Sequence, residues 1–272
     1  MKNGLRIFPI MVIYKSQLGR SEVYRTLLKG ANFESFMVYD NSPASYNFNQ
    51  SELPANAVYI RDIDNGGVSR AYNVGAQYAS EQGFTHVLLL DQDTSFPPEA
   101  FEVYKKYANT QHICAPILQM KNGAPFSPCV RRGFSTRAVS LSAGNYSLQE
   151  YSPVNSGMCI PLATFFSAGR YNEKVKLDFA DFEFISRCRK VCETLTILPI
   201  KAIQDFSNDE KNLDKLFARY VLYLESASAT RWETLQEKIM FHIEVLKHTV
   251  ALTRRTETVL FLRQYIRMLF NK

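Results

Sequence analysis

The first hundred residues alternate between short apolar runs and longer stretches whose apolar residues repeat with helical spacing. An apolar run of about four to eight residues between polar turn residues is typical of a buried strand. Such runs predict strands within residues 6–14, 33–42, 56–64 and 86–93, and the stretches between them predict helices at 21–31 and 67–83. Repeated β-α units with short connections predict an α/β fold, with a mainly parallel mixed sheet and flanking helices.

The pattern changes twice further along the chain. Residues 115–150 are rich in Ser, Gly and Pro, so strands and loops are expected there, followed by a helix near 180–190 and a strand at 195–200. From about residue 208 the chain is predicted to be helical, which divides it into an α/β domain (1–205) and a C-terminal helical region (206–272). One helical stripe is continuous enough to be buried against the α/β domain or a second copy; it consists of Trp232, Leu235, Ile239, Ile243, Leu246 and Val250.

Composition narrows the class of protein. The chain has 272 residues, 46% of them hydrophobic, which is ordinary for a soluble globular protein. No apolar run approaches the length of a membrane span, and five scattered cysteines favour reduced thiols in the cytoplasm. Residues 231–272 hold 8 Lys and Arg but 4 Glu, so they carry +4 of the net charge of +6. A basic tail favours phosphates or an anionic membrane surface, and no nucleic-acid partner is expected.

Two acidic residues follow the fourth predicted strand directly. In HVLLLDQD the apolar run ends at Asp91 and Asp93, and ligands of such sheets bind beyond the carboxyl ends of the strands. The sequence contains no G-x-G-x-x-G after the first strand, no P-loop motif and no G-x-S-x-G. A carboxylate pair suits Mg²⁺ or Mn²⁺, which take further ligands from substrate phosphates, so a nucleoside diphosphate compound is the implied substrate. The alternative is a turn or helix cap before Pro97.

The order of several segments resembles one enzyme family. These segments are VIYKSQ, FMVYDNS, DNGGVSRAYNVGAQYA, HVLLLDQDTSFP, VNSGMCIP and LDFADFEFISRCRK, within residues 6–205. Together they resemble the inverting GT-A glycosyltransferases of family 2, especially the bacterial rhamnosyltransferase-like branch. The resemblance implies a GT-A fold, a nucleotide-sugar donor, a divalent metal, and transfer of one sugar with inversion at the anomeric carbon.

The resemblance also implies roles for residues on the donor side. Asp93 is expected to hold the Mg²⁺ or Mn²⁺ ion on the diphosphate, together with Asp91, which should also lie near the ribose. The remaining donor positions begin with Tyr14 and Asp40, for which ordinary packing and turn formation are the alternatives. Those positions are Tyr14 against the base, Asp40 on the pyrimidine, and Gly67, Arg70 and Asn73 near the donor.

On the acceptor side, the resemblance points to the acidic segment LDFADFEF. Asp181 is the candidate base, with Asp178 and Glu183 as fallbacks, although acids also favour a helix N-terminus through its dipole. The loop of Asn155, Ser156 and Gly157 matches the family's acceptor-side loop. Many relatives have a His after the late strand, but here Gln204 or Asp205 stands there, and no catalytic residue is expected after 205.

The resulting expectation is an enzyme of bacterial surface polysaccharide assembly. It would move a sugar, with rhamnose favoured, from a dTDP- or UDP-sugar to a saccharide acceptor, expected to be lipid-linked, at the inner face of the plasma membrane. Residues 257–272 form a basic amphipathic pattern that suits a membrane interface, and residues 231–250 suit a homodimer. The alternatives are a sugar-phosphate nucleotidylyltransferase, although IYKSQLGRSE lacks its Gly-rich activating loop, and a non-catalytic nucleotide-sugar-binding protein.

Overall fold

A computed structural model describes residues 4–132, 135–205, 212–231 and 234–270. Its helices are α1 (Gly67–Glu81), α2 (Ala100–Tyr107), α3 (Leu162–Ser167), α4 (Ala180–Cys188), α5 (Leu213–Ala229), α6 (Leu235–Thr256) and α7 (Leu260–Phe270). Its strands are β1 (Ile7–Ile13), β2 (Phe36–Asp40), β3 (Ala57–Arg61), β4 (His86–Asp91), β5 (Thr94–Ser95), β6 (Ile113–Met120), β7 (Pro125–Ser127), β8 (Cys129–Arg132), β9 (Ser135–Ala138), β10 (Gly144–Ser147), β11 (Tyr151–Ser152), β12 (Met158–Pro161) and β13 (Thr194–Gln204).

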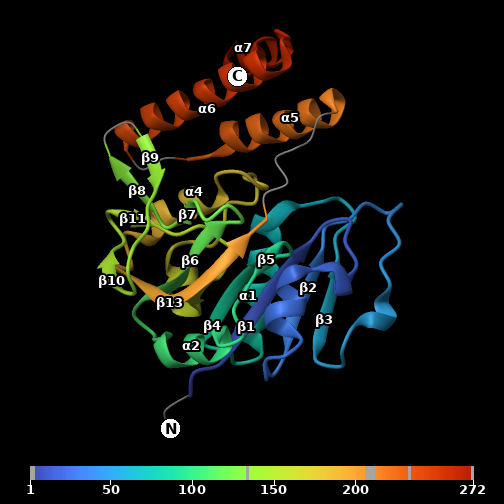
Figure 1. Ribbon diagram of the computed structural model, residues 1–272, viewed down its shortest axis with the longest axis vertical. Helices are drawn as coiled ribbons and strands as arrows, with labels where there is room; N and C mark the ends of the chain where they lie inside the picture. Colours follow the sequence, from blue (N-terminus) through green and yellow to red (C-terminus); the bar gives the residue numbers. More distant parts are fainter. Residues whose placement is uncertain (1–3, 133–134, 206–211, 232–233, 271–272) are drawn as a thin grey trace.

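The main sheet is mixed, with the strand order β10-β13-β6-β12-β4-β1-β2-β3 (Figure 1). The first four strands of the chain pair in parallel, and β12 runs antiparallel between β4 and β6. Strands β5 and β7 pair at the side of this path, and β11-β8-β9 form a second, smaller sheet. The predicted fold class is therefore confirmed. The helix expected at 21–31 is a short π-helical turn, Tyr24–Leu28, preceded by Ser21, whose hydroxyl accepts from the Tyr24 N–H at 3.3 Å.

Helices cover both faces of this sheet because its central strands are apolar on both sides. Successive side chains of a strand point to opposite faces. Phe8 and Ile10 of β1 pack in the cluster that includes α1, α3 and α4, whereas Ile7 and Met11 pack with the π-helical turn and α2. The sheet is thus the middle layer of three.

The strand register brings several polar chain ends to one edge. In parallel pairing, Val12 lies opposite Asp91, Ile13 lies opposite Asp40, and Asp40 lies opposite Arg61. The loop before β12 reaches the same edge, because the Gly157 N–H donates to the Leu89 carbonyl at 2.7 Å. The convergence expected from the α/β pattern is present at the carboxyl end of β4.

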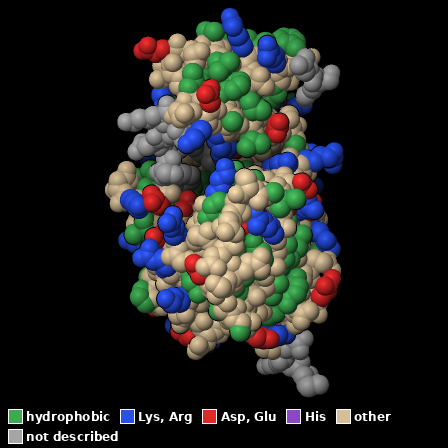
Figure 2. Space-filling model, turned by 90° about the vertical axis from the view of Figure 1, so that its right-hand side faces the viewer, with side chains coloured by type: hydrophobic (Ala, Val, Ile, Leu, Met, Phe, Trp, Pro, Cys, Tyr) green, Lys and Arg blue, Asp and Glu red, His purple; other side chains and the backbone are tan. Residues whose placement is uncertain are grey.

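Helices α5, α6 and α7 stack at the end of the molecule opposite the N-terminus (Figure 1). They enclose a small apolar core of their own, which includes Tyr220, Leu224, Phe241, Val245 and Phe261. Figure 2 shows apolar side chains on the surface of this helical part and Lys and Arg side chains where it meets the α/β body.

The stripe predicted to be buried on α6 is not the face that packs within the chain. Leu235, Ile239 and Leu246 are 73%, 43% and 44% exposed, and Trp232 lies outside the described residues. The buried face lies on the other side of the helix and includes Met240, Phe241, Val245, Thr249 and Leu252. Polar residues on the buried face form hydrogen bonds there. The spacing of the aliphatic residues alone therefore predicted the wrong face of the helix. Burial against the α/β domain was therefore a wrong prediction, and contact with a second copy remains a prediction.

All five cysteines are free and buried. Among the helices of the described residues, none combines the length and the apolar character that a bilayer crossing needs.

Candidate active site

Two carboxylates mark the carboxyl end of β4. The four residues before them, Val87–Leu90, are fully buried, and Asp91 and Asp93 then lie at the point where the chain leaves the sheet. Burial, followed by the negative charge of Asp93, raises the pKa of Asp91 to about 7. Burial also raises the pKa of Asp93. A pair of carboxylates in this setting favours either a shared proton or a bound cation.

Each of the two carboxylates accepts a hydrogen bond from a side chain brought in by another element. The Tyr72 hydroxyl of α1 donates to Asp91 Oδ1 at 3.1 Å, and Gln204 Nε2 donates to Asp93 Oδ1 at 2.7 Å. Gln204 arrives there because β5 pairs with the end of β13, which sets Thr94 opposite Gln204. Gln204 thus stands where relatives were expected to have a His, and it orients the acid predicted to hold the metal.

Asp181 lies in the first turn of α4, on the other side of this space. Its Oδ1 accepts the Phe182 N–H at 2.8 Å. Burial raises the pKa of Asp181 to about 6, the Phe182 N–H opposes this rise, and the charge of Asp178 adds to it. The charge of Asp181 contributes in turn to the raised pKa of Asp91, so the two acids lie within reach of each other's field. A carboxylate of this pKa suits proton abstraction near neutral pH.

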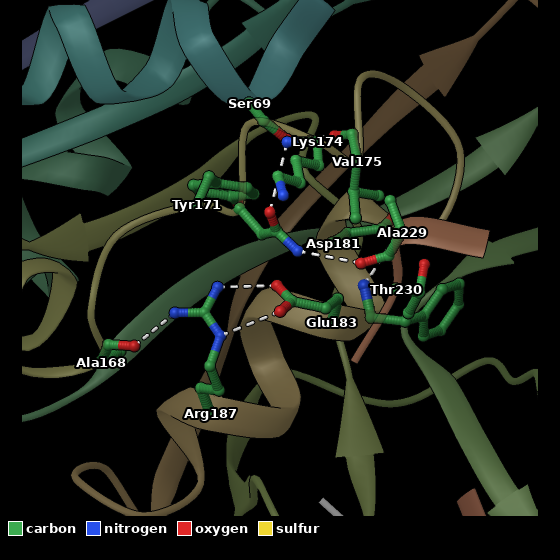
Figure 3. Close-up of polar contacts among 12 residues, drawn as sticks. Ser69, Ala168, Tyr171, Lys174, Val175, Asp181, Glu183, Arg187, Ala229 and Thr230 are labelled. Carbon is green, nitrogen blue, oxygen red and sulfur yellow. Dashed lines mark hydrogen bonds and ion pairs between the residues drawn. The ribbon is translucent and has the colours of Figure 1, made fainter. Parts of the chain in front are cut away.

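The two fallback acids are held in ion pairs. Glu183 is 2% exposed and faces the Arg187 guanidinium, with Arg187 Nη2 at 2.7 Å from its Oε2; Arg187 also donates to the Ala168 carbonyl at 2.5 Å (Figure 3). Both oxygens of Asp178 accept from the Arg219 guanidinium of α5. Both carboxylates are thereby less suited to take a proton than Asp181.

Tyr171 and the acceptor-side loop close the site between these acids. The Tyr171 hydroxyl donates to Asn155 Oδ1 at 2.6 Å, and its ring stacks on Phe184 of α4 at 4.0 Å. Ser156 shares a 2.6 Å hydrogen bond with Thr94, and a hydrogen bond from the Asn155 backbone partly opposes the rise that burial causes in the pKa of Asp181. The loop therefore lies between Asp181 and the end of β4.

Sequence reasoning missed Tyr72 and Tyr171 as members of the site. Both are fully or almost fully buried, and burial raises the pKa of each well above its usual value, with further contributions from Asp91 and Asp181. The available signal was weak: a buried tyrosine hydroxyl needs a partner, but the sequence does not say which one.

On the donor side, the structure distinguishes Tyr14 from Asp40. Tyr14 follows β1, is 44% exposed, and has the Lys15 ammonium 5.1 Å from its ring centre. Asp40 is fully buried, and its oxygens accept from the Ser42 N–H and the Tyr59 hydroxyl, each at 2.8 Å. Asp40 thus fits the alternative of turn formation, whereas Tyr14 presents an open ring at the sheet edge.

Two of the expected donor positions on α1 contact the segment 171–176 instead. Asn73 exchanges hydrogen bonds with the backbone of Tyr171, at 2.9 and 3.0 Å. Gly67 has φ +83°, and a Cβ there would lie 2.1 Å from the Lys176 carbonyl oxygen, so only glycine fits. Arg70 is different, because it is about half exposed and lies 3.6 Å from Asp62.

The acids at the end of β4 fit a divalent cation that is shared with a substrate. The described residues contain no group of three or more His, Cys, Asp or Glu side chains able to hold a metal by themselves. Mg²⁺ and Mn²⁺ accept one or two carboxylates when phosphate oxygens complete the coordination. A cation would also relieve the repulsion that raises the pKa of Asp91. Asp93 and Asp91 would hold it.

The mixed α/β sheet with its flanking helices is the fold of the GT-A glycosyltransferases, and a comparison with protein families agrees. The chain belongs to glycosyl transferase family 2, whose model matches residues 10–157. Among individual relatives, it is 20% identical over 198 residues to the dTDP-rhamnosyl transferase RfbF of Shigella flexneri, in a match that covers 71% of this chain and 66% of RfbF.

Solved structures share the fold. GalNAc-T7, solved with UDP, GalNAc and Mn²⁺, superposes with a TM-score of 0.58 at 12% identity, covering 90% of this chain and 55% of that one. S. aureus TarS 1–349 gives a TM-score of 0.57 at 14% identity, covering 97% and 79%. Its complex with UDP gives 0.53 at 13% identity, covering 92% and 73%. At these identities the likeness shows the GT-A fold.

We expect Asp93→Ala to lose about 10²–10³-fold of sugar transfer, because the charge developing on the leaving diphosphate would lose its electrostatic partner. The fold should survive, since Asp93 contributes little to the core. Transfer is measured with Mg²⁺ or Mn²⁺ present. Glu99→Ala is the matched control, since it removes a nearby exposed acid. Near-normal turnover of Asp93→Ala would contradict the assignment.

We expect Asp181→Asn to lose about 10²–10⁴-fold of transfer while binding of donor and metal persists, because only the base is removed. In the unmodified protein, kcat/KM should rise with pH through about 6, where the Asp181 carboxyl loses its proton, and this rise should disappear in the variant. An active Asp181→Asn, combined with an inactive Asp178→Asn or Glu183→Gln, would mean that another acid is the base.

Proposed function

We propose that this protein is a metal-dependent inverting glycosyltransferase that moves a sugar from a dTDP- or UDP-sugar to a saccharide acceptor. The observation that carries this proposal is the placement of Asp91 and Asp93 at the end of β4, with Asp181 at the start of α4 near enough for its charge to act on Asp91. The pair Asp91 and Asp93 suits the diphosphate side of a donor, and Asp181 suits an acceptor hydroxyl. This arrangement supports a reaction in which the leaving diphosphate and the attacking hydroxyl are served by different acids.

In the proposed reaction, Asp181 takes the proton of the acceptor hydroxyl while the oxygen of that hydroxyl bonds to the anomeric carbon of the donor sugar. The bond between that carbon and the diphosphate oxygen breaks on the opposite face, and the nucleoside diphosphate leaves with the electron pair. A single displacement of this kind inverts the anomeric centre. A bound Mg²⁺ or Mn²⁺ supplies charge stabilisation for the leaving diphosphate. Gln204 and Tyr72 keep Asp93 and Asp91 in place for that role.

Three similar proteins support the donor class. RfbF is named a dTDP-rhamnosyl transferase, and both GalNAc-T7 and TarS have been solved with UDP. The Mn²⁺ in the GalNAc-T7 structure supports the metal. Rhamnose is the favoured sugar because of the RfbF likeness, and bacterial surface polysaccharide is the favoured product.

We expect a panel of dTDP- and UDP-sugars to show Mn²⁺-dependent binding and slow donor hydrolysis, with dTDP-rhamnose preferred. Isothermal titration calorimetry measures binding, and nucleoside diphosphate release measures hydrolysis; Asp93→Ala is the control. A protein that only binds nucleotide-sugars would bind without release. A nucleotidylyltransferase would instead form pyrophosphate from a nucleoside triphosphate and a sugar phosphate. Either result would replace the proposed function.

We further propose that the acceptor is lipid-linked and that residues 257–272 bring the protein to the inner face of the membrane. Five apolar side chains at the start and along α7 are exposed by 36% to 81%: Val259, Leu262, Ile266, Leu269 and Phe270. Arg263 and Arg267 lie beside this row on the helix, where they can meet anionic headgroups. The opposite face, with Phe261 and Tyr265, packs against α5 and α6. The exposed apolar side chains of α6, Leu235, Ile239 and Leu246, support the alternative proposal, a homodimer through residues 231–250.

We expect the full chain to float with anionic vesicles and to lose flotation at high salt, which screens the arginines. The double variant Ile266→Glu with Phe270→Glu should no longer float, because it places charge in the apolar row. Val191→Glu is the matched control, since Val191 is equally exposed but lies in the α/β domain. Equal flotation of wild type and double variant, or none by either, would remove the membrane role. Loss of a dimer in Leu235→Glu would then favour the second copy.

A further inference from the structure

We infer that the C-terminal helices hold the segment that presents Asp181, and that Arg219 of α5 is a positioning residue for this acid. The inference rests on the proposed role of Asp181 as the base. None of the three C-terminal helices is needed to explain the donor side of the site. They contact the acceptor side through residues immediately before Asp181 and through the far end of α4.

The first contact is the paired hydrogen bond between Arg219 and Asp178. Both guanidinium nitrogens Nη1 and Nη2 reach the carboxylate, with Nη2 at 2.8 Å from Oδ1. Asp178 precedes Asp181 by three residues, and the two side chains of the pair are 45% and 25% exposed. A half-exposed ion pair contributes little to global stability. A two-pronged arginine–carboxylate contact does, however, fix the direction of the carboxylate and of the chain that carries it.

The second contact is made by Phe179, the residue between that pair and α4. Phe179 has φ +69°, a left-handed conformation that is strained for a residue other than glycine. Its ring lies 4.9 Å from the ring of Tyr223 on α5 and 4.8 Å from that of Phe241 on α6. Its carbonyl accepts the Glu183 N–H at 2.9 Å, so this left-handed turn starts the helix that carries Asp181. Strain of this kind persists only where the surroundings hold the residue in place.

The third contact is at the other end of α4. Glu237, in the first turn of α6, accepts from the Ser186 hydroxyl at 3.2 and 3.3 Å and lies 3.5 Å from Arg189 Nη1. The same Glu237 closes a capping box with Thr234 at the start of α6. Helix α4 is therefore held at both ends by α5 and α6. Since Asp181 is in its first turn, these contacts set the direction in which the carboxylate points into the site.

The test compares Arg219→Ala and Arg219→Lys in the full chain. We expect Arg219→Ala to lower kcat by about 10–100-fold, because a small displacement of a catalytic group is enough for such a loss. The donor KM and the affinity for UDP with Mn²⁺ should change less than about twofold, because Asp91 and Asp93 are untouched. Arg219→Lys should recover part of the activity, since lysine keeps the positive charge but cannot make the two-pronged contact with Asp178. Lys247→Ala, which removes an exposed pair within α6, is the matched control.

A second measurement needs no substrate. Hydrogen exchange followed by mass spectrometry on peptides spanning 177–188 should be faster in Arg219→Ala than in wild type, and unchanged in Lys247→Ala. The melting temperature should fall by no more than about 4 °C. If Arg219 acts through Asp178, the double variant with Asp178→Asn should be no worse than the poorer single variant.

Two results would overturn the positioning role while leaving the proposed function standing. One is unchanged exchange and unchanged kcat in Arg219→Ala beside an inactive Asp181→Asn. The other is an equal loss of kcat and of UDP affinity, or a large fall in melting temperature, which would indicate a general structural role. Full activity of Asp181→Asn would instead reject the assigned base, and with it the positioning role of Arg219, while glycosyl transfer with another acid as the base would still be open to test.

Discussion

The structure around the site depends on offsetting three buried carboxylates at one end of a largely buried sheet, among which Asp91 feels the charge of both Asp93 and Asp181. Asp91, Asp93 and Asp181 are each shifted toward protonation, mainly because burial removes water from them and also because of neighbouring negative charge. Such a group of acids is unfavourable unless hydrogen-bond donors or a cation offset it. The elements around the site supply those donors, and a substrate that brings a divalent ion would supply the rest.

The compensating groups explain why the fold is arranged as it is at this edge. Tyr72 comes from α1, Gln204 comes from the end of β13, and the Phe182 N–H comes from the first turn of α4. Each belongs to a different part of the chain. The site therefore forms only when the parallel strands, the returning strand β13 and helix α4 are all in place.

Much of this framework could be predicted from the sequence, because periodicity is a local property. The strand of buried residues before Asp91 was visible as an apolar run, and the convergence of strand ends follows from parallel pairing alone. The partners of the acids were not visible, because Gln204 is 111 residues from Asp93 in the chain. Periodicity also failed on α6, where aliphatic residues such as Ile239 suggested one face and Phe241 is buried on the other.

Some residues that resembled donor contacts take part in the site indirectly. The segment 171–176 is the common partner: Gly67 and Asn73 of α1 fix its backbone, and Tyr171 within it reaches Asn155 and stacks on α4. Its residue Asn172 also donates to the Ala229 carbonyl at the end of α5, at 3.1 Å. One short segment therefore joins helix α1, the loop of Asn155, helix α4 and the C-terminal region. A position on α1 can thus fix the placement of α4 relative to the end of β4 through the segment 171–176, without contacting Asp91, Asp93 or Asp181 itself.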